Sequence, residues 1–144
     1  TTAADTTAAD SAADTKAAPA DKIGQAGSGK ELIFTTGGMS VDPDDRTPLA
    51  IKNTGADIIT YGAPVLPGAM FLLSYYDAGD RLVPICGLPG CAMYNKRTIF
   101  DIVLPRLMAC DMILADELAG LGEGGLCLNC DVCTFPNCGF GKGF

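Results

Sequence analysis

Four cysteines near the C-terminus have the residue type and the spacing of metal ligands. They follow the pattern C-x2-C-x2-C-x4-C: Cys127, Cys130, Cys133 and Cys138. Thiolates separated by two residues can bind one metal, because the short turn between them points both sulfurs inwards. Disulfides are the competing interpretation, but thiols so close in sequence are awkward to pair. The spacing therefore predicts a metal-binding tail.

The sequence leaves the kind of metal open. The C-x2-C-x2-C run resembles the loops that hold iron–sulfur clusters, although the last interval is one residue longer than the usual three. Structural zinc more often uses two distant ligand pairs. We therefore expect an iron–sulfur cluster, with zinc as the alternative. Large apolar side chains are few between Gly120 and Phe144, so we expect this tail to fold only around its metal.

A second group of chemically useful residues follows the apolar run at 32–36. Gly37 and Gly38 allow backbone N–H groups to approach an anion, and Ser40 adds a hydroxyl donor. Three carboxylates come next: Asp42, Asp44 and Asp45. They are hard oxygen ligands that could gather Mg²⁺. An acidic turn leading into a helix is an equally good interpretation, because Asp and Pro are ordinary turn residues.

The composition limits both the chemistry and the partners. The chain has 144 residues, enough for one domain, and no histidine, which excludes catalysis that depends on an imidazole base. Its net charge of −7 has the wrong sign for binding the negatively charged backbone of nucleic acid. No apolar run approaches the roughly 20 residues of a membrane span, and no leader opens the chain. We expect a cytoplasmic protein with neither a nucleic-acid nor a membrane partner.

Apolar runs separated by glycine turns predict the elements that position these residues. Strands are expected at 32–36, 58–61, 70–76 and 81–86, and helices at 48–53, 91–107 and 111–118. The first strand is mostly apolar and should be buried. Pro105 should kink or end the second helix. The alternation of strands and helices indicates an α/β domain around a mostly parallel sheet.

The first residues of the chain differ from the rest. Thr, Ala and Asp recur with a period of about five over residues 1–22, without one large apolar side chain. Such a segment cannot bury enough apolar surface to fold. We therefore divide the chain into a disordered linker (1–30), an α/β domain (31–119) and the small Cys-rich metal-binding tail (120–144).

Three motifs in order resemble the molybdopterin-binding domain of molybdopterin adenylyltransferase, molybdopterin molybdenumtransferase and the competence-damage-type proteins. They are TTGGMSVDPDD at 35–45, PVLPGAMFLL at 64–73 and PICGLPGCAMY at 84–94. The resemblance runs from about residue 31 to about residue 107. It implies a doubly wound α/β domain, present here as its C-terminal portion, that binds the pterin at the carboxyl ends of the strands.

The resemblance also implies roles for individual residues. The cofactor-binding set would be Thr36, Gly37, Gly38, Ser40, Pro67, Gly68, Gly87, Leu88, Pro89 and Gly90. The carboxylates of Asp42, Asp44 and Asp45 would be catalytic, through Mg²⁺ or molybdate chemistry.

The function that the resemblance implies is molybdopterin binding in the biosynthesis or handling of the molybdenum cofactor, by molybdenum insertion or adenylyl transfer. The alternative is a non-catalytic carrier or sensor of molybdopterin. Such a carrier would dock a molybdoenzyme or a cofactor-biosynthesis partner through the cysteine tail. A homo-oligomer is compatible with either role.

Overall fold

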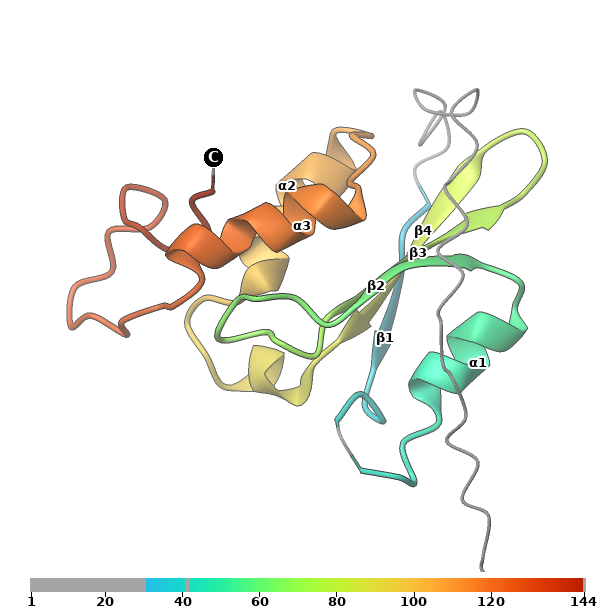
Figure 1. Cartoon of the computed structure of the whole chain (residues 1–144), viewed down its shortest axis with the longest axis horizontal. Helices are drawn as coiled ribbons and strands as arrows, with labels where there is room; N and C mark the ends of the chain where they lie inside the picture. The colour runs from blue at the N-terminus through green and yellow to red at the C-terminus, as the bar shows by residue number, and fades with distance from the viewer. Residues whose placement is uncertain (1–30, 41, 144) are drawn as a thin grey trace, which may run out of the picture.

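Figure 1 shows the computed structural model of the chain, which describes residues 31–40 and 42–143. The expected linker at 1–30 lies outside these residues. The strands are β1 (Ile33–Thr36), β2 (Asp57–Tyr61), β3 (Leu72–Asp77) and β4 (Leu82–Leu88). The helices are α1 (Thr47–Asn53), α2 (Ile99–Met108) and α3 (Ala115–Gly120), with short 3₁₀ helices η2 (Gly90–Met93) and η3 (Leu121–Gly124). No helix of the described part is long and apolar enough to cross a membrane.

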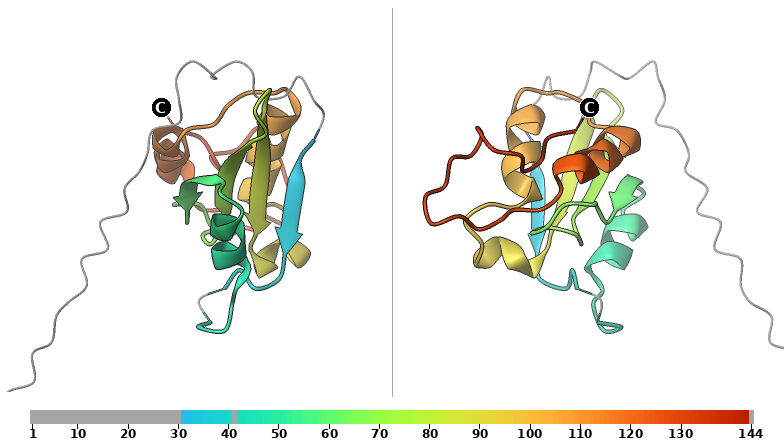
Figure 2. Two further views of the ribbon diagram at one scale, coloured as in Figure 1. Left: turned by 90° about the vertical axis from the view of Figure 1, so that its right-hand side faces the viewer. Right: turned by 60° about the vertical axis from the view of Figure 1, so that its left-hand side comes forward.

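The four strands form one sheet in the order β1-β4-β3-β2, with β1 and β2 at its two edges (Figure 2). The α/β class is confirmed. The sheet is mixed instead of mostly parallel: β1 and β4 are parallel, whereas β3 is antiparallel to both β4 and β2. The reason lies in the connections. Only residues 78–81 join β3 to β4, and a parallel crossover needs a dozen or more.

Helices cover both faces of the sheet, α1 on one face and α2 with α3 on the other (Figure 1). Successive strand residues therefore point into two different cores. On β3, Leu72 packs with α1 and its neighbour Leu73 packs with α2. On β4, Ile85 lies in the core with α1 and Cys86 in the core with α2. The layering is that of a doubly wound domain.

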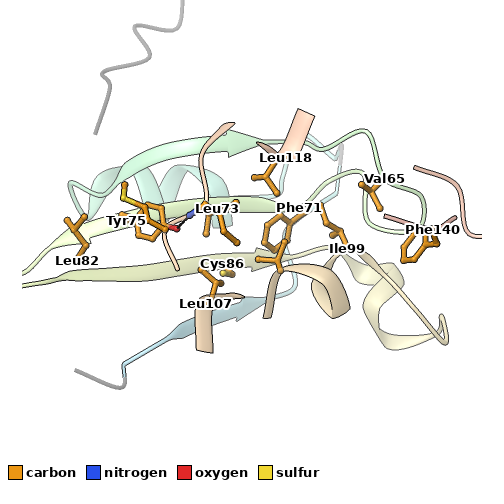
Figure 3. Close-up of a cluster of buried hydrophobic side chains, with 13 residues drawn as sticks. Val65, Phe71, Leu73, Tyr75, Leu82, Cys86, Ile99, Leu107, Leu118 and Phe140 are labelled. Carbon is orange, nitrogen blue, oxygen red and sulfur yellow. Dashed lines mark hydrogen bonds between the residues drawn. The ribbon is translucent and has the colours of Figure 1, made fainter. Parts of the chain in front are cut away.

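The core on the α2 side is the larger of the two, and Figure 3 shows side chains of the sheet, α2 and the tail meeting in it. Phe71, Leu73 and Ile99 are fully buried at its centre. The thiol of Cys86 is also fully buried here, and burial raises its pKa to about 12. Cys86 is therefore a packing residue and not a reactive thiol.

The first strand is more exposed than its apolar sequence predicts. Ile33 and Phe34 on β1 keep 46% and 39% of their surface accessible in the described structure. The expectation of a buried strand is wrong for these residues because β1 lies at an edge of the sheet. Phe34 does gain one aromatic contact, an edge-to-face packing on Phe100 of α2 with ring centroids 5.1 Å apart.

The single helix expected over 91–107 is divided in two. η2 ends at Met93, and α2 begins only after Thr98. The Thr98 hydroxyl accepts a hydrogen bond from the Phe100 N–H (3.2 Å), and the Asp101 carboxylate accepts one from the Thr98 N–H (2.8 Å). This reciprocal pair is a capping box, which satisfies the first N–H groups of the helix and sets its start.

The helices at the end of the domain also differ from expectation. Pro105 lies inside α2, which ends only at Met108, so the proline does not end the helix at its own position. The last helix is shifted from 111–118 to 115–120. Arg106 of α2 joins the two helices, because it pairs with Asp111 (2.5 Å) and with Glu117 of α3 (2.6 Å).

The tail packs against the domain through its two ends. Leu126 pairs with Leu66 as an isolated β-bridge, and the N–H of Cys127 donates to the Leu66 carbonyl (2.8 Å). At the other end Phe140 is 4% exposed in the larger core, and the N–H of Gly141 donates to the carbonyl of Gly124 (2.7 Å). Backbone hydrogen bonds and the burial of Phe140 therefore attach both ends of the tail to the domain.

Candidate functional site

The turn after β1 owes its shape to two glycines. Gly37 and Gly38 have φ of +82° and +61°, a region that side chains disfavour. The Thr47 hydroxyl donates to the Gly37 carbonyl (2.8 Å), and a Cβ at Gly38 would lie 2.6 Å from the Thr47 Oγ1. Gly38 is thus required for close packing of the turn on the start of α1.

The acidic residues after this turn bond to the turn itself. One carboxylate oxygen of Asp45 accepts from the Ser40 N–H (2.7 Å) and from the Ser40 hydroxyl (2.5 Å). The Asp42 carboxylate accepts from the Asp44 N–H (3.0 Å), and the Asp45 N–H donates to the Asp42 carbonyl (3.0 Å). The three aspartates therefore build a turn that orients Ser40, which agrees with the second of the two interpretations of this sequence.

A cavity of about 500 Å³ opens beside Ser40. Four segments form it: the turn after β1, the loop between β2 and β3, the segment after β4, and the start of the tail. Its lining residues are Met39, Ser40, Leu66, Pro67, Gly68, Ala69, Met70, Pro89, Gly90, Cys91, Leu126 and Cys127. Since β1 and β4 are parallel neighbours, the cavity lies where the carboxyl ends of two parallel strands meet, a usual place for ligands in α/β sheets.

The cavity brings together half of the residues expected to bind the cofactor. Five of the ten line it: Ser40, Pro67, Gly68, Pro89 and Gly90. The other five lie in or directly after the neighbouring strands and do not line it: Thr36, Gly37, Gly38, Gly87 and Leu88. Gly87 supports the wall instead, because a Cβ there would lie 2.5 Å from the Cε of Met39. Asp42, Asp44 and Asp45 do not line it either.

Sequence reasoning did not predict several of the lining residues. Met39 carries no signal beyond its place in the first motif, and Cys91 carries none beyond its place in the third. Leu126 and Cys127 come from the tail and reach the cavity only through the pairing of Leu126 with Leu66, sixty residues away in sequence. No local pattern indicates such a contact.

No charged side chain is among the residues that line this cavity. The polar groups available to a ligand are backbone N–H and carbonyl groups, the Ser40 hydroxyl and the thiols of Cys91 and Cys127. Most of the lining surface is apolar, and the volume falls within the usual range for small-molecule sites. The arrangement suits a small organic ligand held by apolar contacts and backbone hydrogen bonds.

The four tail cysteines line a second, smaller cavity of about 100 Å³. Lys96 and Arg97 line it as well, and the Arg97 guanidinium lies 5.2 Å from the centre of the Phe135 ring. Hydrogen bonding from the backbone of Phe135 lowers the pKa of the Cys133 thiol, and Arg97 and Lys96 lower it further. Leu126 and Cys127 line both cavities, so the two share a wall.

Neither group of expected ligands is gathered tightly around one point. Among the residues that the structure describes, no three Cys, Asp or Glu side chains lie close enough to hold one metal ion. This applies to the three aspartates after β1, where Asp45 is bonded to Ser40, and to the four thiols around the smaller cavity.

The chain matches a model of a known protein family. A family model described as a probable molybdopterin binding domain matches residues 2–109. It therefore covers all three sequence motifs and ends just after α2. No individual curated protein matches the chain.

Proposed function

Since the chain belongs to the molybdopterin-binding domain family, we propose that it binds molybdopterin in the 500 Å³ cavity at the ends of β1 and β4. The observation that carries the proposal is the convergence of the three family motifs on this one cavity. Ser40 comes from the first motif, Pro67 and Gly68 from the second, and Pro89 and Gly90 from the third. Membership of the family supports a role in the biosynthesis of the molybdenum cofactor in general.

The cavity fits a tricyclic pterin in size and chemistry. A volume of about 500 Å³ accommodates a ligand of that size, and apolar walls at Leu66, Met70 and Pro89 can cover its faces. Gly90 leaves open space, because apart from Gly90 itself and its two chain neighbours no heavy atom lies within 4 Å of where its Cβ would be. Backbone groups of these loops can then pair with the polar edges of the pterin.

Within cofactor biosynthesis we favour binding and hand-over to a partner over a transfer reaction on this chain. Molybdenum insertion or adenylyl transfer would use Asp42, Asp44 and Asp45 to hold Mg²⁺, but Asp45 is bonded twice to Ser40. The carrier role therefore agrees better with the geometry. Its partner would be a cytoplasmic enzyme that makes or uses the cofactor.

The binding test replaces Gly90 by leucine. Gly90 lines the cavity, has open space at its Cβ position and has no positive φ, so a leucine there should reduce the room for a ligand without disturbing the fold. We expect the dissociation constant for molybdopterin, measured by equilibrium titration without oxygen, to rise more than tenfold. Gly120→Leu is the matched control, because Gly120 also has open space but lies at the end of α3. Unchanged affinity in Gly90→Leu would exclude this cavity as the binding site.

A second measurement separates the carrier from the enzyme. Bound molybdopterin is incubated with Mg²⁺ and either ATP or molybdate, and the released pterin is then identified. A carrier releases molybdopterin unchanged. An adenylylated or molybdenum-loaded product that forms only in the presence of the chain would establish a transfer reaction and contradict the carrier role.

A further inference from the structure

The smaller cavity brings together all four tail cysteines, including the one whose spacing is unusual. Cys127, Cys130 and Cys133 lie at regular intervals, and Cys138 returns to the same cavity five residues later. The chain around them is closed at its base: the N–H of Gly124 donates to the carbonyl of Lys142 (2.8 Å). The thiols therefore sit in one loop with anchored ends.

The size of this cavity argues against a single ion. In a structural zinc site four sulfurs lie about 2.3 Å from one centre and are therefore in mutual contact. Here no three of the described thiols are grouped so closely, and the four line a cavity of about 100 Å³ together with nine other residues. That volume is several times the 10–15 Å³ that holds one water. A compact inorganic cluster, with its own metal and sulfide atoms between the thiolates, suits such a space better.

The charges around the cavity suit an anionic cluster. Four thiolates around an iron–sulfur core carry net negative charge, which must be offset in a chain whose own net charge is −7. Two of the ten cationic side chains, Lys96 and Arg97, line this cavity. The Nε of Arg97 is buried and has no hydrogen-bond partner in the described part of the chain, so it can donate to a thiolate or a sulfide.

From these observations we infer that Cys127, Cys130, Cys133 and Cys138 ligate one four-iron iron–sulfur cluster, which holds the wall between the two cavities in place. Each thiol releases its proton to solvent and binds one iron as a thiolate. Because Leu126 and Cys127 also line the larger cavity, loss of the cluster loosens one wall of the molybdopterin site. This second consequence rests on the proposed function; the cluster itself does not.

The experiment measures the cluster first, without any pterin. The full chain is purified without oxygen, and its iron, sulfide and zinc contents and its visible absorption are determined. We expect about four irons and four sulfides per chain, with the broad absorption of thiolate-ligated clusters. Cys130→Ser and Cys138→Ser should lose most of the iron, whereas Cys110→Ser, which lies outside the cavity, should retain it. One zinc per chain without iron, or no metal at all, would overturn the inference.

Molybdopterin affinity is then compared between cluster-loaded and chelator-stripped protein. We expect stripping to weaken binding by at least fivefold in the wild type and to change nothing in Cys138→Ser, which has no cluster to lose. Circular dichroism checks that each variant keeps its α/β domain. If the cluster forms but the protein does not bind molybdopterin, the proposed function is wrong and the cluster stands. If the protein binds molybdopterin but takes up no iron, the cluster is wrong and the proposed function stands. Equal molybdopterin affinity with and without the cluster would show that the cluster does not hold the wall between the two cavities in place.

Discussion

The role of Asp45 changes when its contacts are considered. From its type and spacing it is a candidate metal ligand, yet in the structure its carboxylate accepts two hydrogen bonds, both from Ser40. A carboxylate that accepts an N–H and an O–H from one residue holds that residue in a single orientation. Asp45 therefore acts through Ser40, which lines the larger cavity.

Replacing Asp45 by asparagine tests this role. Asparagine keeps the size but loses the charge, so the bonds to Ser40 weaken and the dissociation constant for molybdopterin should rise about three- to tenfold, which corresponds to roughly 0.7–1.4 kcal/mol. The effect should be the same with and without Mg²⁺ in the titration. Asp44→Asn is the control, because the contact of Asp44 within the turn is made by its backbone N–H. Normal affinity combined with a lost Mg²⁺ response in both variants would restore the metal-binding interpretation.

Tyr75 connects the sheet to the segment before α3. Its hydroxyl is buried and accepts a hydrogen bond from the Ile113 N–H (2.9 Å), and burial raises its pKa to about 12. The folded protein therefore keeps the phenol neutral over a pH range in which the unfolded chain, with a pKa near 10, ionises it.

This shift predicts a loss of stability at alkaline pH. The contribution of Tyr75 to the free energy of unfolding, roughly 2–3 kcal/mol, is fully present below pH 10 and is lost as the pH rises to about 12. Urea unfolding of the wild type and of Tyr75→Phe across this pH range isolates the contribution of Tyr75 to stability. Ionisation of the buried Cys86 thiol also lowers stability at high pH, but it does so in both proteins. At pH 7 the Phe variant should be about 1–3 kcal/mol less stable, because the buried Ile113 N–H loses its partner. Parallel pH curves for the two proteins would refute the assignment.

The start of α2 depends on the side chains of Thr98 and Asp101. The Thr98 hydroxyl and the Asp101 carboxylate make the capping box that separates α2 from the preceding segment. Helix periodicity alone extends the helix back to residue 91, because periodicity reports which face is apolar and not where the backbone leaves the helix.

Removing the cap should therefore destabilise the domain. Thr98→Ala deletes the acceptor for the Phe100 N–H and should lower the free energy of unfolding by about 0.5–2 kcal/mol in urea denaturation. Thr98→Ser keeps the hydroxyl and should restore most of this loss. An alanine variant as stable as the serine variant would mean that the cap does not determine where α2 begins.

At the scale of the whole molecule, the tail completes the domain. Phe140 is buried in the larger core, the Phe135 ring lies 6.2 Å from it between centroids, and Leu126 pairs with Leu66. The tail thus adds side chains to the core and a wall to the larger cavity, although it follows the last residue matched by the family.

Phe140→Ala tests how strongly the tail is attached. Removing a buried aromatic ring typically costs about 3–5 kcal/mol, and the amide of Gly141, bonded to Gly124, should lose protection in hydrogen exchange. Leu128→Ala is the control in the same tail, because Leu128 is 78% exposed and should change neither quantity. Full protection of the Gly141 amide in Phe140→Ala would show that the tail is anchored elsewhere.

Sequence alone suffices to predict the α/β class, the approximate positions of the four strands, the family, and the three motifs that supply most of the lining of the larger cavity. These features depend on local patterns, because apolar runs, glycine turns and short motifs can each be recognised within about ten residues. The direction of β3 was equally available in principle, because the connection from residue 78 to residue 81 is too short for a crossover.

Features that depend on contacts between distant residues could be known only from the three-dimensional structure. Whether Asp45 faces a metal or Ser40 depends on how the turn closes, and the exposure of β1 depends on its edge position. Cys127 lines the larger cavity only because Leu126 pairs with Leu66. Residue spacing measures separation along the chain, whereas such contacts form only when packing brings remote segments together, and so no local pattern can encode them.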